Sequence, residues 1–171
     1  MAKRQVERSV QTRLGKIAVD EARVIRFPRG LIGFEDRKEF TLLQIKPDSP
    51  FLMLQCVSHP ELGLMVADPF AFLKDYEVKV GNAEQRILRL ENIRQVAVLV
   101  TVTIPKGRPQ ETCLNLTGPI LVNYTARIGL QIPQVDSKYP SRYFIKESKT
   151  KKDAGEDPPG PGGTDTGSGG R

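Results

Sequence analysis

The chain is 171 residues long and carries 26 Lys and Arg against 20 Asp and Glu, a formal net charge of +6. This length fits one domain, because domains commonly contain about 100–150 residues. Its apolar stretches are much shorter than the roughly 20 residues of a membrane-spanning helix, so we expect no membrane span. Tryptophan is absent and aromatic residues make up 6% of the chain, which does not favour base stacking with nucleic acids.

Residues 1–13 are polar and basic throughout. We expect a flexible basic N-terminal arm there, with a first edge strand as the alternative. No apolar stretch follows the basic residues, as it would in a secretory signal peptide, so the expected compartment is the cytoplasm. Residues 16–19 and 24–27 are short alternating runs around a polar break, a pattern that predicts an early hairpin.

The next part of the chain consists of short apolar runs between turns that are rich in Gly and Pro. Residues 28–34 predict a tight loop that tucks apolar side chains inward. Strands are predicted at residues 40–45, 51–57 and 63–67. The second and third of these runs flank a short turn and therefore predict a hairpin.

Residues 76–80 alternate cleanly between polar and apolar types, which predicts another strand. Asn82 is a good residue for a helix N-cap. After it, Ala83, Ile87 and Leu90 fall on one side of a helix of two or three turns. This is the one helix that the sequence pattern supports.

Residues 96–104 read Val-Ala-Val-Leu-Val-Thr-Val-Thr-Ile. Every second side chain, from Val96 to Ile104, points to one face of an extended chain, and the others point to the opposite face. The density of Val and Thr favours a strand. Residues 112–117 repeat the alternation after a Pro- and Gly-containing break, which predicts a hairpin partner. Later strands are predicted at residues 120–124, 127–132 and 139–145.

Many short strands, frequent turns and one short helix indicate an all-β domain, either a barrel or a sandwich of antiparallel strands. We place this domain at residues 14–145. Residues 146–171 begin with charged residues and continue with Gly and Pro. Such a segment has almost nothing to bury, so we expect a disordered C-terminal tail.

The residues that usually carry catalysis are sparse. Cys56 and Cys113 lie in apolar runs without metal-ligand spacing, so we expect buried thiols; a disulfide between them, in an oxidising compartment, is the alternative. The sole histidine, His59, follows Cys56 closely but belongs to a turn, which does not favour a thiol–imidazole pair. We expect no catalytic, cofactor-binding or metal-binding residues, and no enzyme.

The tightest positive group in the body of the chain is Arg23, Arg26 and Arg29. We interpret it as a solvated strand edge, where basic side chains discourage edge-to-edge pairing, and we expect no direct nucleic-acid binding. The alternative is an RNA-binding barrel of the OB type, motivated by the net charge. It predicts an RNA affinity that falls steeply with salt.

Several segments together resemble the flagellar assembly factor family (FliW). The more specific ones are Gly-Phe-Glu at residues 33–35 and Asn-Leu-Thr-Gly-Pro-Ile at residues 115–120. Further matching segments are found at residues 27–32, 54–62, 68–70, 75–77, 96–104 and 127–131. The resemblance spans residues 14–145 and implies a small antiparallel β-barrel-like fold.

The resemblance also implies a function. Members of the family bind the translational regulator CsrA in the cytoplasm and relieve its repression of flagellin mRNA. They also bind flagellin, so that unexported flagellin titrates them away and repression returns. The alternative is a flagellin-specific export chaperone without CsrA binding. The sequence does not separate these two functions, because both need the same flagellin-binding surface.

Candidate protein-binding residues come from the matched segments: Phe70, Tyr76, Asn115, Arg127 and Gln131. Phe70 and Tyr76 flank a strand break and either line a groove or belong to the core. Asn115 points away from its leucine neighbours, to solvent or into a turn-capping hydrogen bond. Arg127 and Gln131 lie at strand positions that face either a partner or water.

Overall fold

A computed structural model of the chain describes residues 6–145. Its strands are β1 Glu7–Thr12, β2 Gly15–Asp20, β3 Ile25–Arg26, β4 Glu39–Gln44, β5 Phe51–Cys56, β6 Gly63–Ala67, β7 Val96–Thr103, β8 Cys113–Leu114, β9 Ile120–Asn123, β10 Ile128–Gln131 and β11 Tyr143–Phe144. Its helices are α1 Asn82–Ile87 and the 3-10 helices η1 Glu21–Arg23, η2 Pro69–Ala71, η3 Ile93–Gln95 and η4 Pro109–Glu111. No helix in this part of the chain is long and apolar enough to cross a membrane.

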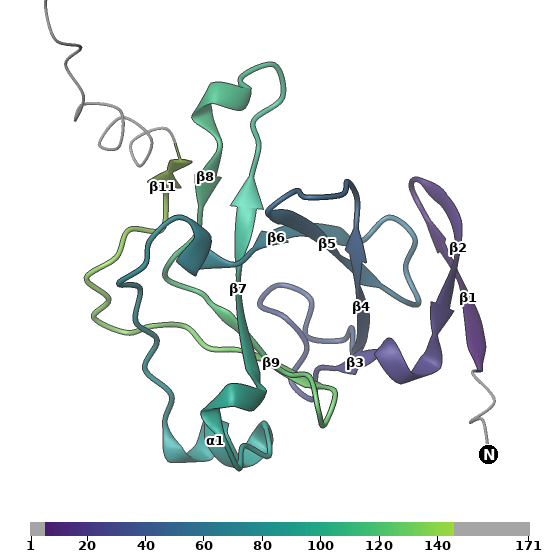
Figure 1. Cartoon of the computed structure of the whole chain (residues 1–171), viewed down its shortest axis with the longest axis horizontal. Helices are drawn as coiled ribbons and strands as arrows, with labels where there is room; N and C mark the ends of the chain where they lie inside the picture. Colours follow the sequence, from purple (N-terminus) through teal and green to yellow (C-terminus); the bar gives the residue numbers. More distant parts are fainter. Residues whose placement is uncertain (1–5, 146–171) are drawn as a thin grey trace, which may run out of the picture.

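The larger sheet closes on itself as a barrel (Figure 1). The ring runs β7-β6-β5-β4-β3-β10-β9, and β9 pairs again with β7. Neighbouring strands are antiparallel except β10 and β3, which pair in parallel at Ile128 and Arg26. Beyond the ring, β8 pairs with the last part of β7, and β11 pairs with β8. The predicted all-β, barrel-like class with one short helix is therefore confirmed, with one parallel contact added.

The two faces of strand β7 contribute to separate cores. Leu99 faces the barrel interior together with Phe27 and Phe40, whose rings meet edge to face with centroids 5.3 Å apart. Val100 and Val102 point to the opposite face, where they pack with the apolar residues of β8 and its neighbours. The predicted alternation is confirmed within β7, because the apolar side chains of its two faces lie in different cores. Ile104 lies beyond the end of the strand and is 44% exposed.

The N-terminal residues differ from the prediction. Residues 7–12 form β1, which pairs with β2 in a separate two-stranded sheet beside the barrel (Figure 1). The flexible arm expected over residues 1–13 is therefore wrong for this stretch, and the strand alternative holds; residues 1–5 lie outside the described residues. Gly15, with φ 113°, supplies the tight turn between the strands.

The hairpin predicted between residues 16–19 and 24–27 is also wrong. Strand β2 pairs with β1, whereas β3 pairs with β4 and β10. The reason is the 3-10 turn η1 that follows β2: the carboxylate of Asp20 accepts a hydrogen bond from the Ala22 N–H at 3.0 Å. This local cap redirects the chain, so that the two alternating runs join different sheets.

Three smaller predictions are corrected. Residues 76–80 are not part of a strand. Helix α1 has Gly81 as its N-cap, without a side-chain cap bond, and Asn82 is its first helical residue. The last strand, predicted at residues 139–145, is limited to β11. The tail predicted at residues 146–171 lies outside the described residues.

Candidate protein-binding surfaces

The two sequence segments that are most specific for the family resemblance meet in one depression, which we call the motif groove. It is a cavity of about 430 Å³ lined by the loop at residues 31–34, the segment at residues 115–118, the end of β7 and Gln131. Ile32 and Phe34 in the loop expose part of their apolar surface. Of the five predicted contact residues, the structure brings Asn115 and Gln131 together here.

Gln131 joins the two walls of the motif groove. Its Oε1 accepts a hydrogen bond from the Ile32 N–H at 2.9 Å, and its Nε2 donates to the carbonyl of Gly118 at 3.0 Å. Asn115 stabilises the turn beside it, because its Oδ1 accepts hydrogen bonds from both the N–H and the hydroxyl of Thr117. Asn115 therefore makes the turn-capping bond that was one of its two expected roles.

The loop wall of the motif groove depends on Gly30. Its φ of 66° lies in the left-handed region, which favours glycine. A Cβ atom at this position would lie 2.6 Å from backbone atoms of Glu35 and Phe34. The loop can fold back this closely only because residue 30 has no side chain.

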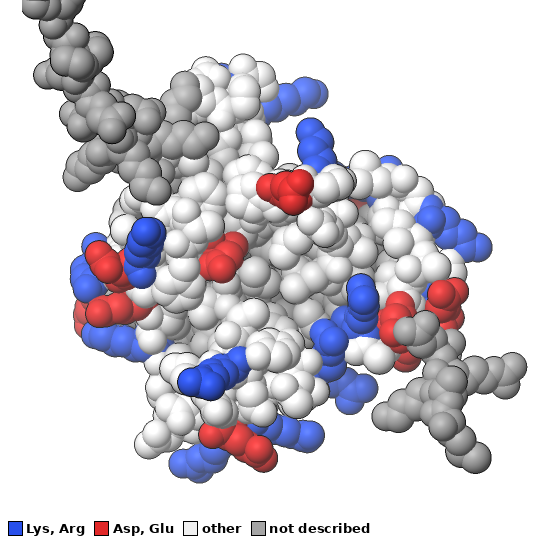
Figure 2. Space-filling view, in the orientation of Figure 1, with Lys and Arg blue, Asp and Glu red and all other residues white. Residues whose placement is uncertain are grey.

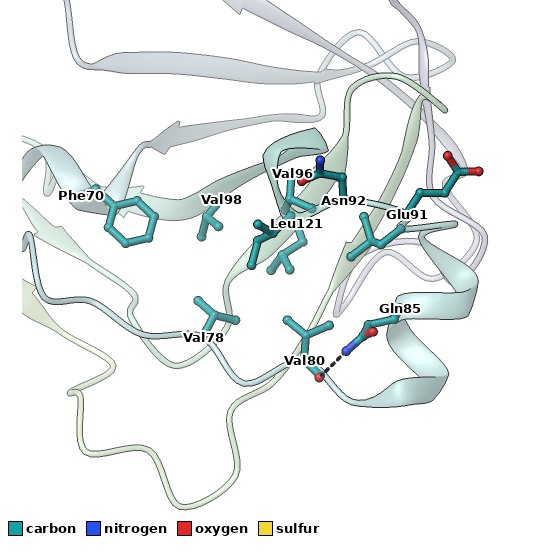
Figure 3. A pocket seen from close by; sticks show the side chains of 11 residues that line it. Phe70, Val78, Val80, Gln85, Glu91, Asn92, Val96, Val98 and Leu121 are labelled. Atoms are coloured by element: carbon teal, nitrogen blue, oxygen red, sulfur yellow. Dashed lines mark hydrogen bonds between the residues drawn. The ribbon is translucent and has the colours of Figure 1, made fainter.

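A second depression, which we call the apolar groove, lies between helix α1 and strand β7. It has a volume of about 420 Å³, and its apolar lining is Phe70, Val78, Val80, Leu90, Ile93, Val96, Val98 and Leu121 (Figure 3). Phe70 is 42% exposed and Ile93 is 86% exposed. Large side chains with this much exposed apolar surface are typical of partner-binding sites when they gather around a depression. Of the predicted contact residues, only Phe70 lines this groove.

One wall of the apolar groove, residues 76–80, is held by side chains in place of a neighbouring strand. The Lys79 N–H donates to Oε1 of Gln134 at 2.7 Å, and Nε2 of Gln134 donates back to the Lys79 carbonyl at 3.1 Å. The Glu77 N–H donates to the Tyr139 hydroxyl at 3.0 Å. Sequence reasoning missed Gln134 and Tyr139, because nothing local marks a side chain that pairs with a distant backbone.

Tyr76 is a core residue. Its side chain is 3% exposed, and its hydroxyl donates to the carbonyl of Leu116 at 2.7 Å. Burial raises the pKa of Tyr76 to about 12, and the nearby Tyr139 adds to the effect. Of the two roles that the sequence left open for Tyr76, the core position is the one observed. Its ring nevertheless contacts that of Phe70, with centroids 6.0 Å apart, and so packs against a residue that lines the apolar groove.

Arg127 lies away from both grooves. It occupies the turn between β9 and β10 and lines a third depression of about 290 Å³, which we call the arginine cleft, together with Arg26 and Arg89. Strand β3, which carries Arg26, has neighbours on both sides. The interpretation of this arginine as part of an unpaired strand edge is therefore wrong.

Cys56, Ser58 and His59 lie next to one another at the end of β5. The Ser58 hydroxyl is 3.5 Å from the Cys56 sulfur and 3.2 Å from Nδ1 of His59. Cys56 is completely buried, so its sulfur does not face solvent. Cys56 and Cys113 are both free buried thiols, as the sequence indicated.

Comparison with known proteins agrees with the resemblance. The FliW protein family matches residues 8–145. The flagellar assembly factor FliW of Nitratidesulfovibrio vulgaris strain DP4 is 58% identical over 142 residues, which cover 83% of this chain and 82% of that protein. The corresponding factor of Desulfovibrio desulfuricans is 46% identical over 155 residues, covering 90% and 93%.

Comparison with solved structures indicates the same family. A crystal structure of the flagellar assembly factor FliW aligns with a TM-score of 0.76 and 29% sequence identity, and the match covers 81% of this chain and 96% of that one. The matched family region includes the whole closed barrel and both grooves. The chain belongs to the FliW family of flagellar assembly factors.

Proposed function

We propose that this protein is a cytoplasmic flagellar assembly factor that binds CsrA and thereby relieves the repression of flagellin mRNA. It also binds flagellin, which couples flagellin synthesis to flagellum assembly. The observation that carries the proposal is the 58% identity to a curated flagellar assembly factor over 83% of the chain. An identity this high over most of the chain supports a shared function.

The mechanism we propose is an exchange of protein partners without a chemical step. The barrel carries two separate depressions of similar volume, about 430 and 420 Å³, with different linings. The motif groove presents backbone and amide groups beside Ile32 and Phe34, whereas the apolar groove suits the apolar face of a helix. Two such surfaces on one small domain fit a protein that responds to two partners.

A packed contact path between the two grooves supports communication between them. Phe70 in the apolar groove contacts the buried ring of Tyr76, and the Tyr76 hydroxyl binds the Leu116 carbonyl, in the segment that lines the motif groove. If binding at one groove changes the affinity at the other, the effect must be reciprocal. Unexported flagellin would then weaken CsrA binding even without direct overlap.

The direct test is binding of the purified protein to CsrA and to flagellin on size-exclusion chromatography. We expect a complex with each partner at micromolar concentration, and release of CsrA when flagellin is added. One substitution in each groove, Ile32→Ser in the motif groove and Ile93→Ser in the apolar groove, should then show which groove each partner binds. The absence of both complexes would contradict the proposal.

A flagellin-specific export chaperone without CsrA binding would also use a flagellin-binding surface. The two functions differ in their effect on translation. If the proposal is correct, deletion of the gene lowers flagellin synthesis from its mRNA, and a CsrA pull-down recovers this protein. Unchanged flagellin translation, together with a flagellin complex and no CsrA complex, would favour the chaperone.

A further inference from the structure

The arginine cleft brings three arginines together outside both grooves, beside two glutamates. Arg26, Arg89 and Arg127 line it, and among residues 6–145 none of the three takes part in a salt bridge. The nearby acidic residues Glu21 and Glu39 are instead bridged by Arg8, at 3.7 and 3.2 Å. Figure 2 shows Lys and Arg side chains beside strand β3, with acidic side chains next to them.

Two of these arginines occupy strained backbone positions. Arg89 has φ 52° and Arg127 has φ 56°, both in the left-handed region. The other described non-glycine residues with positive φ are Asp48 and Asp136, and aspartate tolerates this conformation better than arginine does. Arginine therefore occupies two turn positions where glycine or asparagine would be more favourable.

One buried side chain fixes both turns. Asn123 is 1% exposed; its Nδ2 donates to the carbonyls of Leu88 and Arg89 at 2.8 and 3.2 Å. Its Oδ1 accepts from the N–H groups of Thr125 and Ala126, each at 3.0 Å, in the turn that leads to Arg127. The Arg127 carbonyl in turn accepts from the Arg26 N–H at 2.9 Å. The backbones that carry the three arginines thus form one connected unit.

The chemistry of the cleft selects a ligand with separate carboxylate groups. Guanidinium groups bind carboxylates with paired, charge-assisted hydrogen bonds. The rest of the lining is Val24, Ala126, Ile128 and the two glutamates, with no aromatic ring. Single-stranded nucleic acid is usually held by base stacking on aromatic side chains, and this lining has none. A peptide can place its carboxylates on the arginines and its aliphatic groups on the apolar lining.

We propose that Arg26, Arg89 and Arg127 form a binding site for an acidic peptide segment of a partner protein. The site is additional to the two grooves and does not depend on CsrA or flagellin being the partner. Because the ion pairs are exposed, salt should weaken them, since screening acts over about 10 Å at 0.1 M salt.

The test uses the full chain and a fluorescein-labelled octaglutamate peptide, with binding followed by fluorescence anisotropy at low salt. We expect saturable binding that weakens at least about fivefold between 20 and 200 mM salt. Arg89→Gly and Arg127→Gly should each weaken binding about fivefold or more, while the midpoint of thermal unfolding stays unchanged or rises, because glycine relieves the positive φ. Arg26→Gln, which leaves the backbone unchanged, should weaken binding to a similar extent.

The matched control is Lys106→Gln, which removes the same charge from the exposed loop between β7 and β8. It should leave peptide binding unchanged. An equal loss in the control would show that only net charge matters and would overturn the proposal. So would the absence of peptide binding at low salt, variants that bind like the original protein, or tighter binding of a uridine octanucleotide that the same arginine substitutions abolish.

Discussion

The motif groove and the apolar groove have nearly equal volumes, but their walls are fixed in different ways. In the motif groove, the backbone of the loop is folded tightly around Gly30 and tied by Gln131 to the segment at residues 115–118. In the apolar groove, an extended segment without a strand partner is held by side chains of Gln134 and Tyr139 and lies over an apolar floor.

The difference concerns which interactions set the shape of a surface. The motif groove depends on backbone conformation, so a single misplaced Cβ atom should deform it. The apolar groove depends on a few replaceable side-chain hydrogen bonds, so its extended wall should open locally while the barrel stays folded. This contrast predicts that substitutions reduce the free energy of unfolding most at the loop glycine, Gly30, and least at the exposed rim of the apolar groove.

The largest effect is expected at Gly30. Gly30→Ala adds both a positive-φ penalty and a Cβ atom 2.6 Å from the backbone of Glu35 and Phe34. We expect the free energy of unfolding to fall by about 2–4 kcal/mol in urea denaturation. Gly33→Ala is the matched control, because φ is 85° there but the space is open. It should lose only about 1 kcal/mol. Equal losses would mean that the tight fold of the loop is unimportant.

The next effect is expected at Tyr76, which lies between the grooves. Tyr76→Phe removes the hydroxyl and leaves the buried Leu116 carbonyl without this donor. We expect a loss of about 1–2 kcal/mol in the free energy of unfolding. Tyr124→Phe is the control, since the Tyr124 hydroxyl donates to the Arg94 carbonyl at an exposed position and should matter less. A larger loss in the control would contradict the assignment of Tyr76 to the core.

The same side chain predicts a dependence on alkaline pH. In the folded protein the pKa of Tyr76 is raised from its usual value of 10.0 to about 12. Between these values the folded state holds a proton that the unfolded chain has lost, so the free energy of unfolding decreases as pH rises from about 10 to 12. Thermal melts across this range should show a steeper decrease for the original protein than for Tyr76→Phe. Parallel curves would contradict the raised pKa.

A reciprocal pair of substitutions compares the hydrogen bonds of Gln131 in the motif groove with those of Gln134 at the apolar groove. Gln131→Ala should expose the Ile32 amide to hydrogen exchange and leave the Lys79 amide protected. Gln134→Ala should do the reverse, because each side chain makes its hydrogen bonds at only one of the two grooves. Each should reduce the free energy of unfolding by about 1 kcal/mol. If either substitution exposes both amides, the two walls open together and the contrast between the grooves is lost.

The smallest effect on stability is expected at the rim of the apolar groove. Ile93 is 86% exposed, so Ile93→Ser should change the free energy of unfolding by less than about 0.5 kcal/mol. If a partner helix binds the groove, the same change should weaken that complex, as measured by calorimetry with flagellin. Val135→Ser is a suitable control, because Val135 is 80% exposed and lies outside this groove.

Much of the fold could be predicted from local patterns. The alternation in β7 predicted both the strand and its two faces, and the apolar runs at β4, β5 and β6 predicted consecutive antiparallel strands. These patterns succeed because successive side chains of a strand point to opposite faces whatever the rest of the chain does. The pairing of β2 was predicted wrongly, because a single Asp20-capped turn decides which strand it joins.

The candidate sites were less accessible to sequence reasoning. Asn115 and Gln131 were singled out separately, but their common groove requires a bond between residues 99 positions apart, from Ile32 to Gln131. The hydrogen bond between the Lys79 N–H and the Gln134 side chain joins residues 55 positions apart, and no local sequence pattern predicts it. Likewise, the arginines of the cleft come from three separate elements that only the closed barrel brings together.

The amino-acid sequence by itself determined most of the strand-forming segments and the all-β class, because side-chain alternation and turn-forming residues act over a few positions. The family followed from the resemblance of its sequence motifs. Only the tertiary structure decided the closure of β9 on β7, the burial of Tyr76 and the composition of each groove. The physical reason is that these features arise from hydrogen bonds and packing between distant segments, whose partners become neighbours only when the barrel closes.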